Sequence, residues 1–285
     1  MKILDGKHVA AKVEHELKRT IGTFVRPPGL AFILVGENPA SHTYVRMKKK
    51  KCQDVGIASF DKIFRQDASE KEVLAHIEHL NRDPLVDGIL IQLPLPSHLS
   101  TQKVLSAIDP GKDVDGLHPC NFGKLLLGET DGFIPCTPLG IQTLLKAYEI
   151  KTAGKHVVIV GRSNIVGKPL AALLMQKKEG ANATVTIAHS ATHHLKEITK
   201  SADILVAAMG HPLSITADMV KLKSVVIDVG INRVGGRIAG DVDYEAVAPL
   251  VSAITPVPGG VGPMTIAMLM SNVVQSYETK LSSKK

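Results

Sequence analysis

The alternation of short apolar runs with helical patterns constrains the fold of this chain more than any other feature. Strand-like apolar runs stand at residues 29–36, 86–96, 155–161, 183–189, 203–210 and 224–232. Helical patterns lie between them, as at residues 69–81, 100–109 and 168–177. Strands that are separated by helices imply crossover connections, which join parallel strands. The sequence therefore predicts an α/β fold with a mainly parallel sheet.

The strand and helix pattern restarts near residue 137, which indicates two domains. A chain of 285 residues suits two domains of ordinary size. We predict an N-terminal α/β domain of residues 1–139 and 264–285, since the helix after Pro263 is expected to return to it. Residues 140–263 have the rhythm of a Rossmann-like dinucleotide-binding domain. Thr137 is expected to cap the joining helix, with Pro138 in its first turn.

The formal net charge of +7 limits the class of partner. Apart from residues 48–51 and the terminal KLSSKK, the basic residues are dispersed, which favours an anionic small molecule over nucleic acid or a membrane surface. The scarcity of aromatic residues argues against nucleic-acid binding by base stacking. The uncharged span 247–277 is interrupted by proline and glycine, so we expect a buried loop and a helix there, not a membrane span.

The cysteine pattern indicates the compartment. Cys52, Cys120 and Cys136 lie far apart and form no C-x-x-C pair. This predicts a reduced chain without disulfides and without a zinc site. The first residues show no apolar signal-peptide region. We therefore expect a cytoplasmic protein that carries no metal.

The turn GRSNIVGKP follows a predicted strand and precedes a helix, which is the context of a phosphate-binding turn. Its spacing departs from G-x-G-x-x-G, because Ser163 replaces the second glycine and Gly167 comes one residue late. An ordinary strand-to-helix turn remains an alternative. The next strand ends in His189 without the acid that binds the ribose of NAD, and Arg162 stands in the turn. A guanidinium without a nearby carboxylate suits a 2′-phosphate, so NADP is favoured over NAD.

The lysine run at 48–51 raises the question of which lysine has a chemical role. If Ser41 caps a helix, then Tyr44 and Lys48 share a face with apolar residues, while Lys49 and Lys50 point away. A partly desolvated Lys48 with other cations nearby would suit proton transfer. The alternative is that Lys48 reaches past the edge of the core to water.

Other polar residues follow the predicted strands. Gln92 interrupts an apolar strand and needs a partner if buried. Asp115 stands in a turn, where the Asp-Gly pair alone could explain it. Ligands of α/β sheets bind beyond the carboxyl ends of strands, so both residues could lie at such a rim. The loop at 255–265 would let a flat ligand approach its backbone, or else simply connects two domains.

Seven stretches, taken together, resemble one family. In chain order they are YVRMK, GILIQLPLP, KDVDGLHPCNFGKL, FIPCTPLG, GRSNIVGKP, VVIDVGIN and TPVPGGVGPMT. The combination covers almost the whole chain and is similar to the bifunctional methylenetetrahydrofolate dehydrogenase/cyclohydrolase family, the FolD type. The resemblance implies oxidation of 5,10-methylenetetrahydrofolate with NADP, then hydrolysis of the methenyl product to 10-formyltetrahydrofolate in the same cleft. It also implies a place in one-carbon metabolism and purine biosynthesis.

The resemblance assigns roles to residues. It implies that Lys48 is the general acid/base, that Gln92 hydrogen-bonds near it, that Tyr44 packs along the folate and that Asp115 anchors the pterin amino edge. The implied substrate-binding set is Tyr44, Ser41, Gln92, Asp115, Cys136, Pro258, Gly259 and Gly262. The implied cofactor-binding set is Thr137, Gly161, Arg162, Ser163, Ile165, His189, Ser190, Thr192, Gly210, Ile231 and Thr265. The family also implies a homodimer through the cofactor domain, and the basic chain suits folates with an anionic polyglutamate tail.

Three alternatives stay open at this point. The chain could be a dehydrogenase without cyclohydrolase activity, against which Lys48 argues. It could be another two-domain NADP oxidoreductase, resembling shikimate dehydrogenase, whose substrate pocket would need polar groups different from YVRMK and KDVDGL. It could also be a non-enzymatic nucleotide- or nucleic-acid-binding protein. Binding to DNA would then fall steeply with salt.

Overall fold

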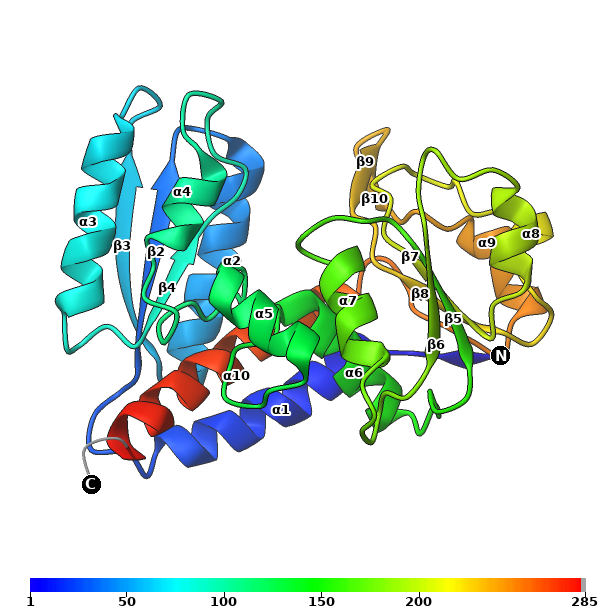
Figure 1. Ribbon diagram of the computed structural model, residues 1–285, viewed down its shortest axis with the longest axis horizontal. Helices are drawn as coiled ribbons and strands as arrows, with labels where there is room; N and C mark the ends of the chain where they lie inside the picture. Colours follow the sequence, from blue (N-terminus) through cyan, green and yellow to red (C-terminus); the bar gives the residue numbers. More distant parts are fainter. Residues whose placement is uncertain (283–285) are drawn as a thin grey trace. The chain divides into compact units, whose positions relative to one another are not determined.

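The computed structural model describes residues 1–282, which divide into two compact units (Figure 1). The first unit holds Met1–Ala11 and Thr137–Thr265, and the second holds residues 12–136 with the described residues from 266 on. The sequence had placed residues 1–11 with the N-terminal domain. They belong to the first unit because strand β1 (Lys2–Ile3) pairs in parallel with β11 (Ala253–Ile254).

The second unit is built on a three-stranded parallel sheet in the order β3-β2-β4. These strands span Ala58–Phe64, Gly29–Val35 and Gly88–Ile91. The central strand β2 is buried along its whole length, which explains its uninterrupted apolar sequence. One face packs against α3 (Glu70–Arg82) and α4 (Thr101–Ser106). Helix α2 (Pro39–Val55) contacts β2 and β3.

The helix caps of the second unit test the sequence expectations. Ser69, the first residue of the helical pattern at 69–81, caps α3 in a full capping box with Glu72. The assumption that Ser41 caps α2 is wrong, because Asn38 accepts from the amides of Ala40 and Ser41 while Ser41 is buried inside the helix. Helix α5 (Pro119–Leu127) completes this unit together with most of α1 (Gly6–Ile21) and of α10 (Val261–Ser282).

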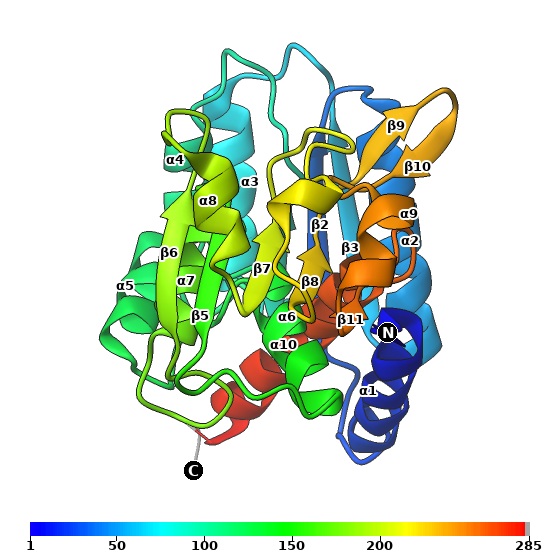
Figure 2. The same ribbon diagram turned by 90° about the vertical axis from the view of Figure 1, so that its right-hand side faces the viewer.

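The first unit contains a six-stranded parallel sheet in the order β1-β11-β8-β7-β5-β6 (Figure 2). The strands not yet given span Val225–Asp228 (β8), Ile204–Ala207 (β7), His156–Val160 (β5) and Thr184–Ala188 (β6). Apart from β1, strand β5 comes first along the chain in this sheet, and the next two strands, β6 and β7, lie on either side of it. The strand order therefore reverses beside β5, at the position where doubly wound sheets bind their ligands.

Helices and short turns surround this sheet. They are α6 (Cys136–Ala147), α7 (Gly167–Leu174), α8 (Leu195–Lys200), α9 (Tyr244–Val247) and the 3₁₀ turns Ala217–Met219 and Ala248–Leu250. Strands β9 (Asn232–Val234) and β10 (Arg237–Ala239) form a separate antiparallel hairpin. Helix α6 begins at Cys136, so the prediction that Thr137 caps it is wrong. Among residues 1–282, no helix has the length and apolar character needed to cross a membrane.

Candidate functional site

Lys48 is held by a hydrogen bond from its side chain to Gln92. The Lys48 side-chain nitrogen Nζ donates to Gln92 Oε1 over 3.1 Å, and Gln92 Nε2 donates to the Leu93 carbonyl over 2.8 Å. Because its amide nitrogen is used by that carbonyl, Gln92 presents its oxygen to the lysine. Gln92 follows β4 directly, and its own backbone N–H continues the pairing with β2 through Ile33. The sheet thus fixes the position of the lysine's partner.

The neighbouring lysines are engaged elsewhere. Lys49 forms an ion pair with Asp61, and Lys51 forms one with Glu14. Lys49 and Lys50 line an open cavity of about 450 Å³ between α2 and β3, and Lys48 does not. The helix therefore separates Lys48 from Lys49 and Lys50, as its periodicity predicted.

Asp115 lies in a tight turn that a buried carboxylate shapes. Asp113 is 1% exposed and accepts hydrogen bonds from the backbone of Leu117 and His118 and from the side chain of Asn121. Burial raises the pKa of Asp113 to about 7, although these hydrogen bonds oppose the shift. Gly116 closes the turn with its N–H on the Asp113 carbonyl, at a φ of 72° that favours glycine.

Cys136 is within electrostatic reach of both Asp115 and Lys48. Its thiol donates to the Val114 carbonyl over 3.4 Å. Burial raises the pKa of Cys136 well above its usual value, and the Asp115 carboxylate raises it further while Lys48 opposes the shift. A thiol in this environment stays protonated, so it lines the site as a neutral group. The second unit therefore brings together Lys48, Gln92, Asp115 and Cys136 from separate stretches of sequence.

Tyr44 and Ser41 precede Lys48 on the same helix. Tyr44 stands one turn before Lys48 and is half-buried. Ser41 is 3% exposed, and its backbone N–H is used by the cap at Asn38. Their predicted contacts with a substrate stay predictions.

The predicted cofactor-binding residues of the first unit follow the carboxyl ends of its strands. The turn from Gly161 follows β5, His189 to Thr192 follow β6, Gly210 follows β7 and Ile231 follows β8. All of these strands are parallel, so these segments meet at one edge of the sheet. A hydrogen bond from His189 N to Thr192 Oγ1 and one from Thr192 N to the His189 carbonyl order the segment after β6.

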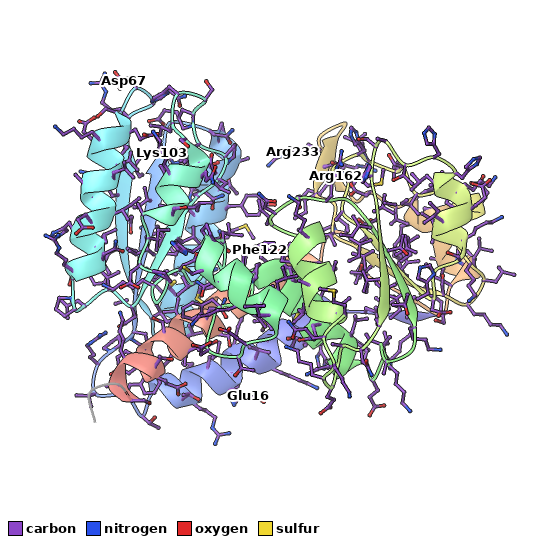
Figure 3. All side chains as sticks on the ribbon, in the orientation of Figure 1. Glu16, Asp67, Lys103, Phe122, Arg162 and Arg233 are labelled. Atoms are coloured by element: carbon purple, nitrogen blue, oxygen red, sulfur yellow. The ribbon has the colours of Figure 1, made fainter. Side chains whose placement is uncertain are left out.

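The residues of this edge fit a dinucleotide. A Cβ at Gly161 would meet the Ala208 carbonyl oxygen at 2.1 Å, and one at Gly167 would meet the Gly161 carbonyl oxygen at 2.0 Å. Glycine is thus required at both positions, where the turn packs against its neighbours. Arg162 is exposed at this turn (Figure 3), and no salt bridge involves it within residues 1–282. With no acid at the end of β6, this donor set suits the phosphates of NADP.

The remaining predicted site residues lie at the start of α6, in the loop before α10 and at the start of α10. The hydroxyl groups of Thr137 and Thr265 form a hydrogen bond, with their oxygens 3.0 Å apart. Gly259 is buried at a φ of 115°, and its carbonyl accepts from the backbone of Lys7. Gly262 lies beside the Ile231 side chain, since a Cβ there would come within 3.8 Å of it. Pro258, which follows a cis bond from Val257, is exposed.

Two buried carboxylates that the sequence analysis missed hold the loops of the first unit. Asp241 is fully buried and accepts from Met209 N, Gly210 N and Asn232 Nδ2. Asp228 accepts from the backbone of Gly230, Asp241 and Val242. Burial, helped by the charge of Asp241, raises the pKa of Asp228 to about 6. For Asp228, the sequence did contain a signal, because this acid ends the apolar run VVID.

We expect Asp241→Ala to lower the free energy of unfolding by about 3 kcal/mol, since three donors in partly buried hydrogen bonds lose their acceptor. Urea denaturation followed by circular dichroism measures the change. Asp243→Ala is the matched control, because Asp243 only caps α9 through Ala246 and should cost about 1 kcal/mol. Equal losses for the two variants would contradict the role of Asp241.

No group of three or more His, Cys, Asp or Glu side chains that could hold a metal ion occurs in the part of the chain that the structure describes. The three cysteines are free, and Cys120 is exposed.

Comparison with known proteins identifies close relatives. Residues 4–115 match the model of the tetrahydrofolate dehydrogenase/cyclohydrolase catalytic domain, and residues 135–281 match that of its NAD(P)-binding domain. The chain is 56% identical to the bifunctional protein FolD of Chlamydia muridarum, over 96% of this chain and 98% of that protein. The crystal structure of FolD from Campylobacter jejuni superimposes with a TM-score of 0.95 at 49% identity, covering 98% and 99% of the two chains. The Trypanosoma brucei FolD structure, complexed with NADP cofactor and inhibitor, gives 0.92 at 35% identity, covering 98% of each.

Proposed function

Because the chain belongs to the tetrahydrofolate dehydrogenase/cyclohydrolase family, we propose that both of its reactions take place at the site around Lys48 and that Lys48 itself serves the hydrolysis. The enzyme oxidises 5,10-methylenetetrahydrofolate with NADP and hydrolyses the methenyl product to 10-formyltetrahydrofolate. The single observation that carries the assignment of Lys48 is its hydrogen bond to Gln92, at a strand end and apart from the ion-paired lysines.

Lys48 is suited to move a proton in the hydrolysis. In its neutral amine form, it takes one proton from the water that adds to the methenyl carbon and returns it to the ring nitrogen that leaves. A C–O bond forms and one C–N bond breaks. Because the methenyl substrate is a cation, the second proton of the water is released to solvent as the formyl C=O forms, and the lysine ends the step unchanged. Gln92 offers only an acceptor to Lys48, so it orients the amine without competing for the proton.

Asp115 and Cys136 contribute binding and shape. The Asp115 carboxylate can accept two N–H bonds from the amino edge of the pterin, an arrangement that a neutral side chain cannot match in strength. The protonated Cys136 thiol adds a neutral wall beside it, because a thiolate next to Asp115 would be repelled. Tyr44, one helical turn from Lys48, packs along the rest of the folate in this proposal.

The cofactor residues are those at the edge of the six-stranded sheet. Arg162 and the hydroxyls of Ser163 and Ser190 hold the 2′-phosphate, and the turn from Gly161 accommodates the pyrophosphate. NADP, when bound, supplies the hydride acceptor. The glycines bring backbone N–H groups close to the phosphates, since no Cβ fits there.

We expect Arg162→Gln to raise the KM for NADP by about 10- to 100-fold while the KM for NAD stays unchanged, because a charge-assisted hydrogen bond to the 2′-phosphate is lost. Steady-state kinetics with both nucleotides measures the effect. Lys200→Gln removes one charge at the end of α8 in the same unit and should change neither value. A parallel rise in both KM values would contradict the 2′-phosphate contact.

Two spectroscopic assays test the function itself. Purified protein is given 5,10-methylenetetrahydrofolate and NADP, and NADPH formation is followed. The decay of supplied methenyltetrahydrofolate is followed separately without nucleotide. We expect both rates to exceed the uncatalysed ones. Formation of NADPH without accelerated methenyl decay would leave a monofunctional dehydrogenase and remove the role of Lys48.

The proposal also covers the form of the folate substrate, the compartment, the oligomeric state and the metabolic role. The excess of basic residues supports polyglutamylated folates as substrates, and a lower KM for the pentaglutamate than for the monoglutamate would test this. The free, exposed Cys120 supports a reducing compartment such as the cytoplasm. We carry over from the family a homodimer, to be tested by analytical ultracentrifugation, and the supply of 10-formyltetrahydrofolate to purine biosynthesis.

A further inference from the structure

The buried amide of Asn272 joins three pieces of the second unit. Asn272 lies on α10 and is 1% exposed. Its Nδ2 donates to the Val114 carbonyl over 2.8 Å and to the Ile134 carbonyl over 3.1 Å, and Cys136 Sγ lies 3.7 Å away. One side chain therefore contacts the residue before Asp115, the segment before Cys136 and Cys136 itself.

The two segments that Asn272 joins also pack tightly against each other. A Cβ at Gly116 would meet Pro135 N at 2.6 Å and the Ile134 carbonyl carbon at 2.7 Å. The Cys136 thiol donates to the same Val114 carbonyl that accepts from Asn272. The turn that carries Asp115 thus has little space to shift unless these hydrogen bonds break.

On its other side, the turn is held by Asp113, whose carboxylate accepts from Leu117, His118 and Asn121. These bonds fix the residues that follow Asp115, and Asn272 fixes the residue before it. Asp115 itself is half-buried and stands between the two supports. Its carboxylate can meet a planar amino edge in two hydrogen bonds only if the backbone is placed to within a fraction of an ångström.

We propose that Asn272 is a positioning residue for the folate substrate, acting through Val114 and Cys136 on the orientation of Asp115. The inference rests on the proposed role of Asp115 in substrate binding. Asn272 does not touch the substrate, so its loss should weaken folate binding without changing the binding of NADP.

The test is a double-mutant cycle of Asn272→Leu and Asp115→Asn, read as KM and kcat for 5,10-methylenetetrahydrofolate and KM for NADP. Leucine has the same number and branching of side-chain heavy atoms as asparagine and removes both donors. We expect Asn272→Leu to raise the folate KM on the order of tenfold with a smaller change in kcat and none in the KM for NADP. In the Asp115→Asn background, we expect the same change to raise the folate KM by less than about twofold.

Ser276→Ala is the matched control for a lost buried hydrogen bond. Ser276 lies one turn further along α10, is also 1% exposed and donates to the carbonyls of Asp87 and Gly111. Its loss should lower stability and leave the folate KM unchanged. A purely structural role of Asn272 would likewise reduce only the active fraction, which lowers kcat and not KM. Should Asn272→Leu not fold, Asn272→Ser keeps one hydroxyl donor and completes the same cycle.

The outcomes separate the inference from its premise. A raised folate KM that is lost in the Asp115→Asn background supports the positioning role. A raised folate KM for Asp115→Asn, with an unchanged or fully additive effect of Asn272→Leu, overturns the inference and leaves the proposed function standing. An unchanged folate KM for Asp115→Asn overturns the assignment of Asp115 and the inference together.

Discussion

In the Lys48→Met variant we expect the hydrolysis of methenyltetrahydrofolate to slow by about a thousandfold, because a positioned acid/base group contributes roughly 10²- to 10⁴-fold to such a step. Methionine keeps an unbranched side chain of similar length but cannot carry a proton. Gln92 then loses its Lys48 donor while its bond to Leu93 remains. The decay of methenyltetrahydrofolate absorbance at fixed pH measures the loss, and the oxidation of the methylene substrate should fall much less.

Lys50→Met is the control within the same run of lysines. Lys50 is exposed and lines the open cavity on the side of α2 toward β3, away from Gln92. Its replacement should leave both rates within about twofold of the wild type, since surface substitutions away from a site have small effects. If Lys50→Met slowed hydrolysis as strongly as Lys48→Met, the loss would reflect general positive charge and not proton transfer by Lys48.

The second large effect is expected in stability, at Asp87. Asp87 is fully buried and accepts from both guanidinium nitrogens of Arg26 over 2.7 and 2.9 Å, from Gly29 N over 2.8 Å and from Lys280 over 3.2 Å. We expect Asp87→Asn to lower the free energy of unfolding at pH 7 by about 3 kcal/mol. In the variant, the cations of Arg26 and Lys280 face a neutral amide. Breaking a buried ion pair costs about 3–5 kcal/mol. Because both cations are partly exposed to water, the expected cost lies at the lower end of that range.

The pH dependence of the stability lost in Asp87→Asn gives a further check. Burial alone would raise the pKa of Asp87, but the hydrogen bonds from Arg26 and Gly29 and the charges of Lys280 and Arg26 lower it below its usual value. A lowered pKa in the folded state means stability that is present above the unfolded pKa and is lost as the pH falls through the folded pKa. The difference in the free energy of unfolding between wild type and Asp87→Asn should therefore become smaller at acid pH. Urea denaturation at pH 7 and pH 3 measures it, and a gap that widened would contradict the ion-pair explanation.

Asp67→Asn serves as the control for Asp87. Asp67 pairs with Arg65 at the surface, where the two side chains are 71% and 87% exposed. Water screens such a pair, so no measurable change in stability is expected at either pH. A loss comparable to that of Asp87→Asn would show that burial does not set the strength of these pairs.

Patterns that repeat within a few residues allowed much of the fold to be predicted. The parallel strands, the Ser69 cap of α3 and the separation of Lys48 from Lys49 and Lys50 all follow from local periodicity or from a local capping pattern. The cap of α2 was misplaced because Ser41 and Asn38 are both good capping residues. Asn38 is followed by Pro39 at the first helical position, and it is this pair that begins the helix.

The remaining features depend on contacts between distant parts of the chain. Strand β1 is two residues long and has no apolar pattern of its own, so its pairing with β11 leaves no local signal. Asn272 stands in an apolar helix, where its sequence neighbours do not show that its amide meets the carbonyl of Val114. Asp241 likewise serves the loop at Met209, to which no spacing rule connects it. Such groups are found only once the backbone carbonyls and amides around them are placed.

The pairing of Lys2 with Ala253 also bears on how the chain is made. A ribosome releases the N-terminus first, and domains generally fold as their last segments emerge. Strand β1 can therefore pair only once β11 has been synthesised, long after β1 itself, and only then can the sheet of the first unit close. A nascent chain stopped before residue 253 would leave β8 without its neighbour β11 and expose an unpaired strand edge. Completion of the first unit's sheet thus depends on the synthesis of Ala253 and Ile254, long after that of the strand β1 with which they pair.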